Sequence, residues 1–168
     1  MLDRLRELTG VGIEELAGGH IEGEIPLTDA VATRLARRYL PASAPVSDLQ
    51  IEAQDGDVVI VQAGLRGSRL LPQVRVHARI EQQPEPHAPV LGLRWSVPGL
   101  GPLTMFAGPL LSLFTALPEG IDADGDRIAV DIARVLRSRG LGELLPYLKR
   151  VRVNSRRGAI IISFAASA

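Results

Sequence analysis

The first strong hydrophobic pattern of the chain predicts an amphipathic helix over residues 27–40. Thr28 is a suitable N-cap, Asp29 falls in the first turn, and arginines gather near the C-terminal end before Pro41 stops the helix. Three aliphatic residues are expected to share one face of this helix: Val31, Leu35 and Leu40. The pattern therefore predicts a helix of about three turns that packs on the rest of the protein.

The chain before this helix carries a weaker pattern. Residues 1–19 predict a helix that ends at the Gly18-Gly19 pair, with two further glycines that lower its helix propensity. We expect residues 1–24 to form an N-terminal helical or loop segment. Residues 25–168 are then expected to form a single α+β domain.

After the helix the hydrophobic period falls to two, which predicts β-strands. Turn residues favour tight hairpins at Asp55-Gly56 and Arg157-Gly158, and residues 73–97 read as one long hairpin. Short helical pieces are expected around residues 133–137 and 141–145. The predicted strands, in chain order, are 49–54, 58–61, 74–81, 91–97, 128–132, 151–155 and 160–162.

Two of these hairpins resemble each other in sequence. Residues 46–63 align with residues 148–165 at a constant offset, which pairs Gly56 with Gly158 and one aliphatic triplet with another. Two interpretations stay open. The chain contains an internal duplication, or two unrelated hairpins share the alternation and the glycine turn that any hairpin requires.

An uncharged run of 24 residues separates Arg94 from Glu119. It is long enough to cross a bilayer if helical throughout, but four prolines and three glycines divide it. Within it, residues 103–117 predict a helix that is kinked at Gly108-Pro109 and apolar around nearly its whole circumference. Such a helix either fills a core or lines an apolar pocket.

Composition narrows the chemistry that the protein can perform. The chain has 168 residues, no cysteine and three histidines, which excludes thiol chemistry and leaves little for a zinc site. No histidine is flanked by residues that would orient a general base, and no catalytic or nucleotide-binding motif is present. The acidic cluster at 122–126 lacks the glycine and the final glutamate of a calcium loop. We therefore expect no catalytic residue, no metal and no cofactor.

The net charge of zero conceals an uneven distribution. Residues 1–65 hold 11 acidic and 5 basic groups, whereas residues 66–168 hold 8 and 14. Residues 127–157 alone contain nine basic side chains, which predicts a cationic surface that could meet lipid phosphates or simply form a solvated sheet face. With six aromatic residues in all, nucleic acid is not an expected partner.

The order of these parts resembles the LmeA-like family of bacterial lipid-binding proteins, which is similar in architecture to the tubular lipid-binding (TULIP) superfamily. The resemblance covers residues 25–165. It rests on the early helix before Pro41, the Asp55-Gly56 hairpin, the segment from Leu117 to Asp131, and the closing hairpin. It implies a helix wrapped by a strongly bent antiparallel sheet, with an apolar groove for phospholipid-like ligands and no catalytic residue.

We therefore predict an α+β fold, with a strongly curved antiparallel sheet and two main helices at 27–40 and 103–117 packed against it. The leading functional hypothesis is non-enzymatic binding of a lipid or another long apolar ligand, in contact with an anionic membrane. The alternative is a protein-interaction module that uses an Arg-rich sheet face, and an enzyme comes third.

The residues expected to contact apolar chains are Trp95, Leu103, Met105, Phe106, Leu110, Leu113 and Phe114. The residues expected to face anionic head groups are Arg134, Arg137, Arg139 and Arg150. Residues 1–20 lack the uncharged core of a secretory signal, so we expect a cytoplasmic or peripheral membrane location, or export if a leader has been removed. The oligomeric state does not follow from the sequence.

Overall fold

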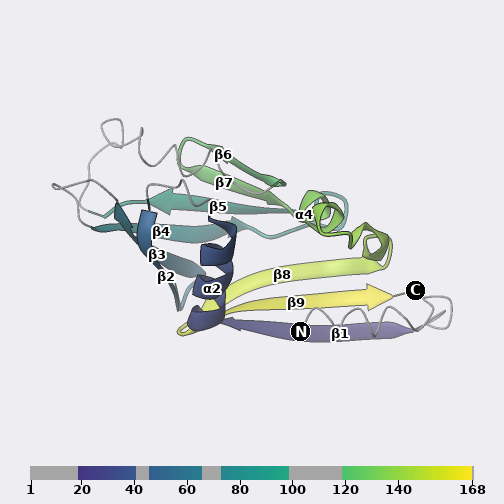
Figure 1. Cartoon of the computed structure of the whole chain (residues 1–168). Coiled ribbons are helices and arrows are strands. Elements are labelled where there is room, and N and C mark those ends of the chain that lie inside the picture. Colours follow the sequence, from purple (N-terminus) through teal and green to yellow (C-terminus); the bar gives the residue numbers. More distant parts are fainter. Residues whose placement is uncertain (1–18, 41–45, 66–72, 99–118, 168) are drawn as a thin grey trace.

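A computed structural model describes residues 19–40, 46–65, 73–98 and 119–167. These residues form two antiparallel sheets with two α-helices and a short 3₁₀ helix (Figure 1), which confirms the predicted α+β class. Neither sheet is strongly curled, so the expected strong curvature is not confirmed. The predicted helix at 103–117 lies outside the described residues.

The small sheet has three strands in the spatial order β1-β9-β8, and the large sheet has six in the order β2-β3-β4-β5-β7-β6. The strands of the small sheet are β1 (His20–Thr28), β8 (Leu148–Arg156) and β9 (Ala159–Ser167). Those of the large sheet are β2 (Val46–Gln54), β3 (Val58–Leu65), β4 (Gln73–Gln82), β5 (Val90–Ser96), β6 (Ile121–Asp124) and β7 (Arg127–Asp131). The helices are α2 (Asp29–Tyr39), α4 (Ile132–Ser138) and η3 (Gly142–Leu144).

One buried cluster lies between the two sheets, and a second lies beside α2, where Ala36 and Leu40 pack against Val46, Leu49 and Ala63. Because side chains alternate along a strand, each sheet turns one largely apolar face inward. Ile80 and Leu91 of the large sheet form a buried cluster with Val153 of the small sheet. Partly buried aliphatic residues surround this cluster: Leu93, Val130, Val151, Ile160 and Ile162. The two sheets therefore stabilise each other mainly by burying these faces.

A missed element is strand β1. Residues 20–24, expected to be helix or loop, belong to this strand, which pairs along its whole length with β9. Gly23 faces Phe164 in this pairing, and a Cβ added at Gly23 would lie 2.8 Å from the phenylalanine ring. A larger residue at this position would therefore displace the Phe164 ring, and the same glycine weakens the strand pattern in the sequence.

The two similar hairpins both form, but in different sheets and with different turns. Three residues connect β2 to β3, whereas Arg157 and Gly158 alone connect β8 to β9. As a result Ile51 pairs with Val61 in the first hairpin, whereas Val153 pairs with Ile162 in the second. The pairing is thus shifted by one residue between the two hairpins. At positions that align in sequence, side chains that face the core in β3 therefore correspond to side chains that face away from it in β9.

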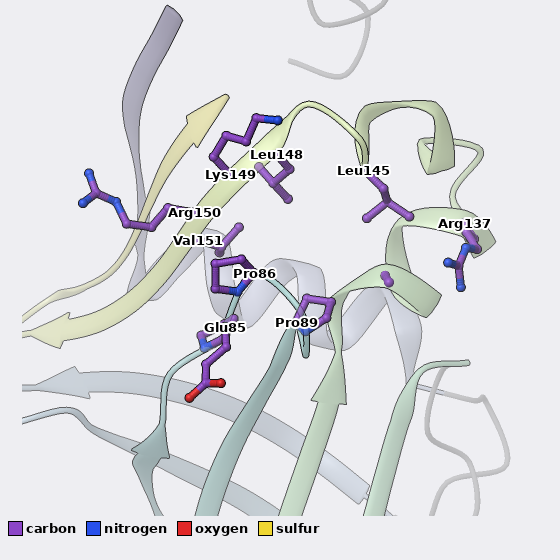
Figure 2. Close-up of a pocket in the computed structure, with 11 residues that line it drawn as sticks. Glu85, Pro86, Pro89, Arg137, Leu145, Leu148, Lys149, Arg150 and Val151 are labelled. Atoms are coloured by element: carbon purple, nitrogen blue, oxygen red, sulfur yellow. The ribbon is translucent and has the colours of Figure 1, made fainter. Parts of the chain in front are cut away.

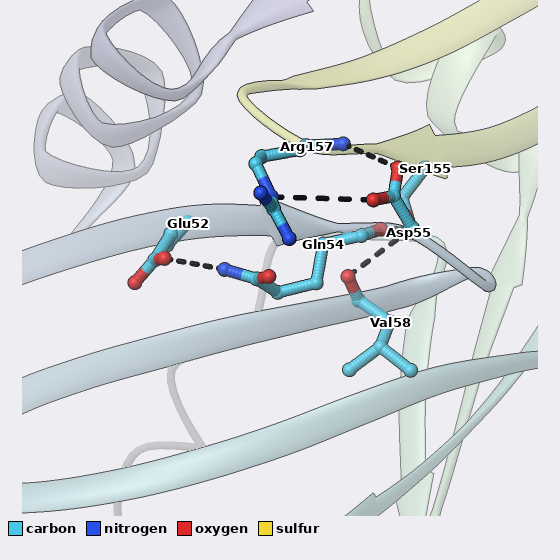
Figure 3. A network of polar contacts seen from close by, with 6 residues as sticks. All are labelled: Glu52, Gln54, Asp55, Val58, Ser155 and Arg157. Atoms are coloured by element: carbon cyan, nitrogen blue, oxygen red, sulfur yellow. Dashed lines mark hydrogen bonds and ion pairs between the residues drawn. The ribbon is translucent and has the colours of Figure 1, made fainter.

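The two hairpin turns meet in a network of polar contacts (Figure 3). Ser155, which is buried, donates its hydroxyl to the carbonyl oxygen of Gln54 at 2.6 Å and also lies 3.1 Å from that of Val58. The backbone N–H of Arg157 donates to the Asp55 carboxylate at 3.0 Å. Hydrogen bonds between the turns therefore join the two sheets at this end of the molecule.

Helix α2 forms within the predicted residues and lies along the outer edge of β2, but its orientation differs from the prediction. Asp29, Thr33 and Arg37, spaced by four residues, all face the edge of β2. The expected inward position of Leu35 is wrong, because Leu35 is 38% exposed whereas Ala32 is 7% exposed. Thr28 stands at the N-cap but makes no side-chain capping bond.

The contacts between α2 and β2 follow from geometry. Four residues of helix rise about 6 Å, close to the roughly 6.8 Å between alternate residues of a strand. The Asp29 carboxylate accepts from Ala53 N–H at 2.9 Å, and the Arg37 side chain donates to the carbonyl of Leu49 at 2.8 Å. Between them, Thr33 accepts from Ile51 N–H at 2.9 Å. Side chains of α2 thus satisfy the backbone of an edge strand that would otherwise be open to other chains.

Candidate functional site

The candidate site is a shallow pocket of about 210 Å³ between β8, the loop that joins β4 to β5, and the helices that follow β7 (Figure 2). Seven of its residues are apolar: Pro84, Pro86, Pro89, Ala133, Leu145, Leu148 and Val151. Charged residues at its border are Glu85, Arg137, Lys149 and Arg150. The pocket thus combines an apolar centre with three cations and one carboxylate.

Local backbone contacts hold the pocket walls in place. The Asp131 carboxylate caps α4 by accepting from Arg134 N–H at 2.9 Å, and Ile132 N–H donates to the carbonyl of Pro89 at 2.9 Å. Because the same helix turn is bonded to the β4–β5 loop, α4 and this loop form one wall. At the start of β8, Ser167 N–H donates to the carbonyl of Tyr147 at 2.9 Å.

The pocket lies where the protection of the β8 edge ends. The Gln83 amide accepts from Val153 N–H at 2.9 Å and donates to Val153 C=O at 2.7 Å, as a neighbouring strand would. Since strand orientation repeats every two residues, the N–H and C=O of Val151 point to the same side. Within the described part of the chain no side chain bonds to them, and Val151 forms part of the pocket wall.

The three cations differ in their surroundings. The Arg150 guanidinium lies 3.2 Å from the Glu22 carboxylate, which also contacts His20 at 3.3 Å, and Figure 2 shows the Arg150 side chain pointing away from the apolar centre. The Lys149 ammonium is 3.3 Å from the carbonyl of Pro146. Among the residues that the structure describes, Arg137 has no ion-pair partner. Arg137 and Lys149 are therefore the cations best placed to meet an anion.

The structure brings together two of the four predicted head-group arginines, Arg137 and Arg150. Arg134 instead lies 3.4 Å from the Asp122 carboxylate, and the Arg139 guanidinium stacks 4.2 Å from the centroid of the Tyr39 ring. Both therefore have partners outside the pocket.

The predicted apolar residues are not gathered at this pocket. Trp95 is 5% exposed, belongs to β5 and does not line the pocket. The other six lie outside the described residues: Leu103, Met105, Phe106, Leu110, Leu113 and Phe114.

Sequence reasoning missed the apolar wall of the pocket and Lys149. The proline-rich loop and the leucines near residue 145 are visible as separate features, but nothing in their spacing shows that they meet β8. Their approach depends on the docking of one sheet on the other, which is a tertiary contact.

Two further observations concern metal ions and membranes. In the described ranges, no three His, Cys, Asp or Glu side chains are grouped so that they could hold a metal ion. Within the same ranges, no helix combines the length and the apolar character needed to cross a membrane.

Comparison of the chain with protein-family models, with curated proteins and with solved structures finds no match. The family resemblance drawn from the sequence pattern therefore remains a prediction.

Proposed function

We propose that this protein binds an anionic amphiphile of the lipid class and performs no reaction on it. The observation that carries this proposal is the pocket itself, which is lined both by apolar residues such as Leu148 and Val151 and by the cations Arg137 and Lys149. An amphiphile matches both parts, because its apolar portion is driven out of water while its anionic group pairs with the cations.

The size of the pocket indicates which part of the ligand it holds. Pockets that enclose a drug-sized molecule usually measure about 300–1,000 Å³. At about 210 Å³ this pocket matches a head group with the first part of its chain. Val151 belongs both to the pocket and to the apolar residues packed between the sheets, so the pocket adjoins the apolar core.

The proposal retains the chain-contacting role predicted for Trp95 and for the apolar residues of the 103–117 segment. It also retains Arg150 as a secondary cation, one that must leave Glu22 to reach a ligand. A TULIP-like arrangement, with a strongly curved sheet around an apolar groove, remains a prediction of the resemblance only. Contact with an anionic membrane is the expected route by which such a ligand enters.

Binding of a lysophosphatidylglycerol below its micelle concentration tests this function, with native mass spectrometry and fluorescence titration as readouts. The double variant Arg137→Glu/Lys149→Glu should weaken binding at least tenfold, because two attractive charges become repulsive. The matched control is Arg79→Glu/Arg127→Glu, which makes the same charge change at two exposed residues of the large sheet. The control should change affinity less than threefold.

Equal affinity losses in the two double variants would show that only net charge matters and would overturn the proposed site. Absence of any binding by the wild type at low salt would overturn the proposed function. Circular dichroism should show that both variants keep the fold, since all four side chains are exposed.

The alternative protein-interaction module receives less support from the charges. On the face of the large sheet that carries Arg75 and Arg94, these arginines lie 3.7 Å from Glu52 and 3.2 Å from Glu81. Arg94 is also 3.5 Å from Asp126. Acidic neighbours thus offset the charge of these two arginines, whereas Arg79 and Arg127 on the same face have no ion pair within the described residues.

A further inference from the structure

Helix α2 exposes an apolar surface that its own sequence would be expected to bury. The exposed large hydrophobic side chains of the described chain are Ile21, Leu35 and Tyr39, with 47%, 38% and 41% exposure. Leu35 and Tyr39 lie one helical turn apart on α2, and the half-buried Val31 lies one turn before them. A continuous apolar stripe therefore runs along the outward side of this helix.

The exposure follows from the way in which α2 is attached to the large sheet. Asp29, Thr33 and Arg37 bind the backbone of β2 and occupy the inner side of the helix. Residues 31, 35 and 39 are each two positions beyond these three, a rotation of about 200° around the axis. The hydrogen bonds to β2 thus turn the apolar stripe outward, in place of the usual burial of such a stripe.

Cations border this stripe. Arg34 and Arg38 are exposed, and neither has an ion pair within the described part of the chain. Arg139, at the C-terminal end of α4, stacks on Tyr39 at 4.2 Å. Asp29, the acidic residue of α2, is turned toward β2. The outward face of α2 therefore carries apolar and positive groups together.

We propose that this face of α2, formed by Leu35, Tyr39, Arg34 and Arg38, docks on an anionic membrane surface. An apolar stripe between arginines is the pattern with which a surface helix lies in the lipid interface, with its side chains in the acyl boundary and its cations among anionic head groups. Tyrosine favours this interface because its ring is apolar and its hydroxyl polar.

The docking surface is a different site from the pocket, and the two are connected through α4. Arg139 contacts Tyr39 of α2, and Arg137, two residues earlier, borders the pocket. A membrane in contact with α2 would therefore lie near the cationic border of the pocket. Docking does not require ligand binding, so each can fail without the other.

Vesicle flotation tests the docking face. Wild-type protein should float with vesicles of phosphatidylcholine containing about one third phosphatidylglycerol, and should stay behind with phosphatidylcholine alone. Arg34→Glu/Arg38→Glu should reduce the bound fraction at least tenfold. Arg79→Glu/Arg127→Glu, with the same charge change on the large sheet, should reduce it less than threefold. Equal losses, or equal binding to neutral vesicles, would refute the proposal.

A second variant reports insertion directly. Leu35→Trp places a fluorophore in the stripe, and its emission should shift to shorter wavelength with anionic vesicles but not with neutral ones. No shift, in a variant that still floats, would place the contact elsewhere and overturn the proposal. Trp95, which is buried, provides a constant background measured in the wild type.

The two proposals are separated by testing each double variant in the assay designed for the other. Arg34→Glu/Arg38→Glu should bind dispersed lysophosphatidylglycerol within threefold of wild type, whereas Arg137→Glu/Lys149→Glu should still float with anionic vesicles. Wild-type protein that binds the dispersed ligand but does not float with anionic vesicles would refute the docking face alone. Wild-type protein that floats but binds no dispersed ligand would refute the proposed function alone.

Discussion

Two strand edges, those of β2 in the large sheet and β8 in the small sheet, are protected in different ways. Side chains of α2 bind the β2 edge at Leu49, Ile51 and Ala53. The β8 edge is bound at Val153 by Gln83 and at Ser155 by Asp57, whereas Val151 has no such partner among the described residues.

The part of the β8 edge that lacks such protection coincides with the pocket. Where protection of the edge is complete, the seam beside the strand is closed. Where it stops, between Val153 and Val151, the candidate site begins, and the β4–β5 loop forms another of its walls. The extent of edge protection thus sets the position of the pocket.

The largest loss of stability is expected from Asp29→Ala, which removes one of the side chains that protect the β2 edge. Ala53 is fully buried, and its N–H would lose a charged acceptor, which costs about 2–3 kcal/mol of unfolding free energy. Urea denaturation measures the loss. Thr28→Ala is the matched control, because Thr28 makes no side-chain capping bond, and it should cost less than about 0.5 kcal/mol. A larger effect at Thr28 than at Asp29 would contradict this assignment.

A smaller loss, of about 1–2 kcal/mol, is expected from Gln83→Ala, which leaves the N–H and C=O of Val153 without their side-chain partner. Gln83→Glu keeps an acceptor for the N–H but places a second carboxylate oxygen against the Val153 carbonyl oxygen, so it should also destabilise the protein. Equal stabilities of the three proteins would show that Gln83 does not protect the edge.

The smallest expected effect is a difference in amide hydrogen exchange between two residues of the wild-type protein. Amide hydrogen exchange should be at least tenfold faster at Val151 than at Val153, because only the latter N–H is bonded to Gln83. In Gln83→Ala the two rates should approach each other. Similar protection of Val151 and Val153 in the wild type would mean that the edge is closed along its whole length.

Several elements were predictable because their signals are local. The β2–β3 and β8–β9 hairpins follow from alternation and glycine turns, and α4 agrees with the helical piece expected at 133–137. Strand β1 was missed because Gly23 and Pro26 weaken its pattern and its partner β9 lies more than 130 residues away. Pairing over that distance is decided by tertiary packing.

The orientation of α2 and the composition of the site failed for a different reason. Amphipathicity assigns the apolar stripe of a helix to the core, but here Thr33 and its neighbours bind a strand edge, and Leu35 faces outward. Charge counting named Arg134, Arg137, Arg139 and Arg150 together. It could not show that Arg137 and Arg150 line the pocket whereas Arg139 stacks on Tyr39, which comes from a distant helix.

The seam between β8 and the large sheet also differs in bond strength along its length. Nearest the pocket, Gln83 holds Val153 through a neutral amide, whereas the carboxylates of Asp57 and Asp55 hold Ser155 and Arg157 near the turn. Bonds to a charged acceptor are roughly twice as strong as neutral ones. If the two sheets are pulled apart, this seam should therefore open first at Val153 beside the pocket and last at the turn, where the hydroxyl of Ser155 is bonded as well.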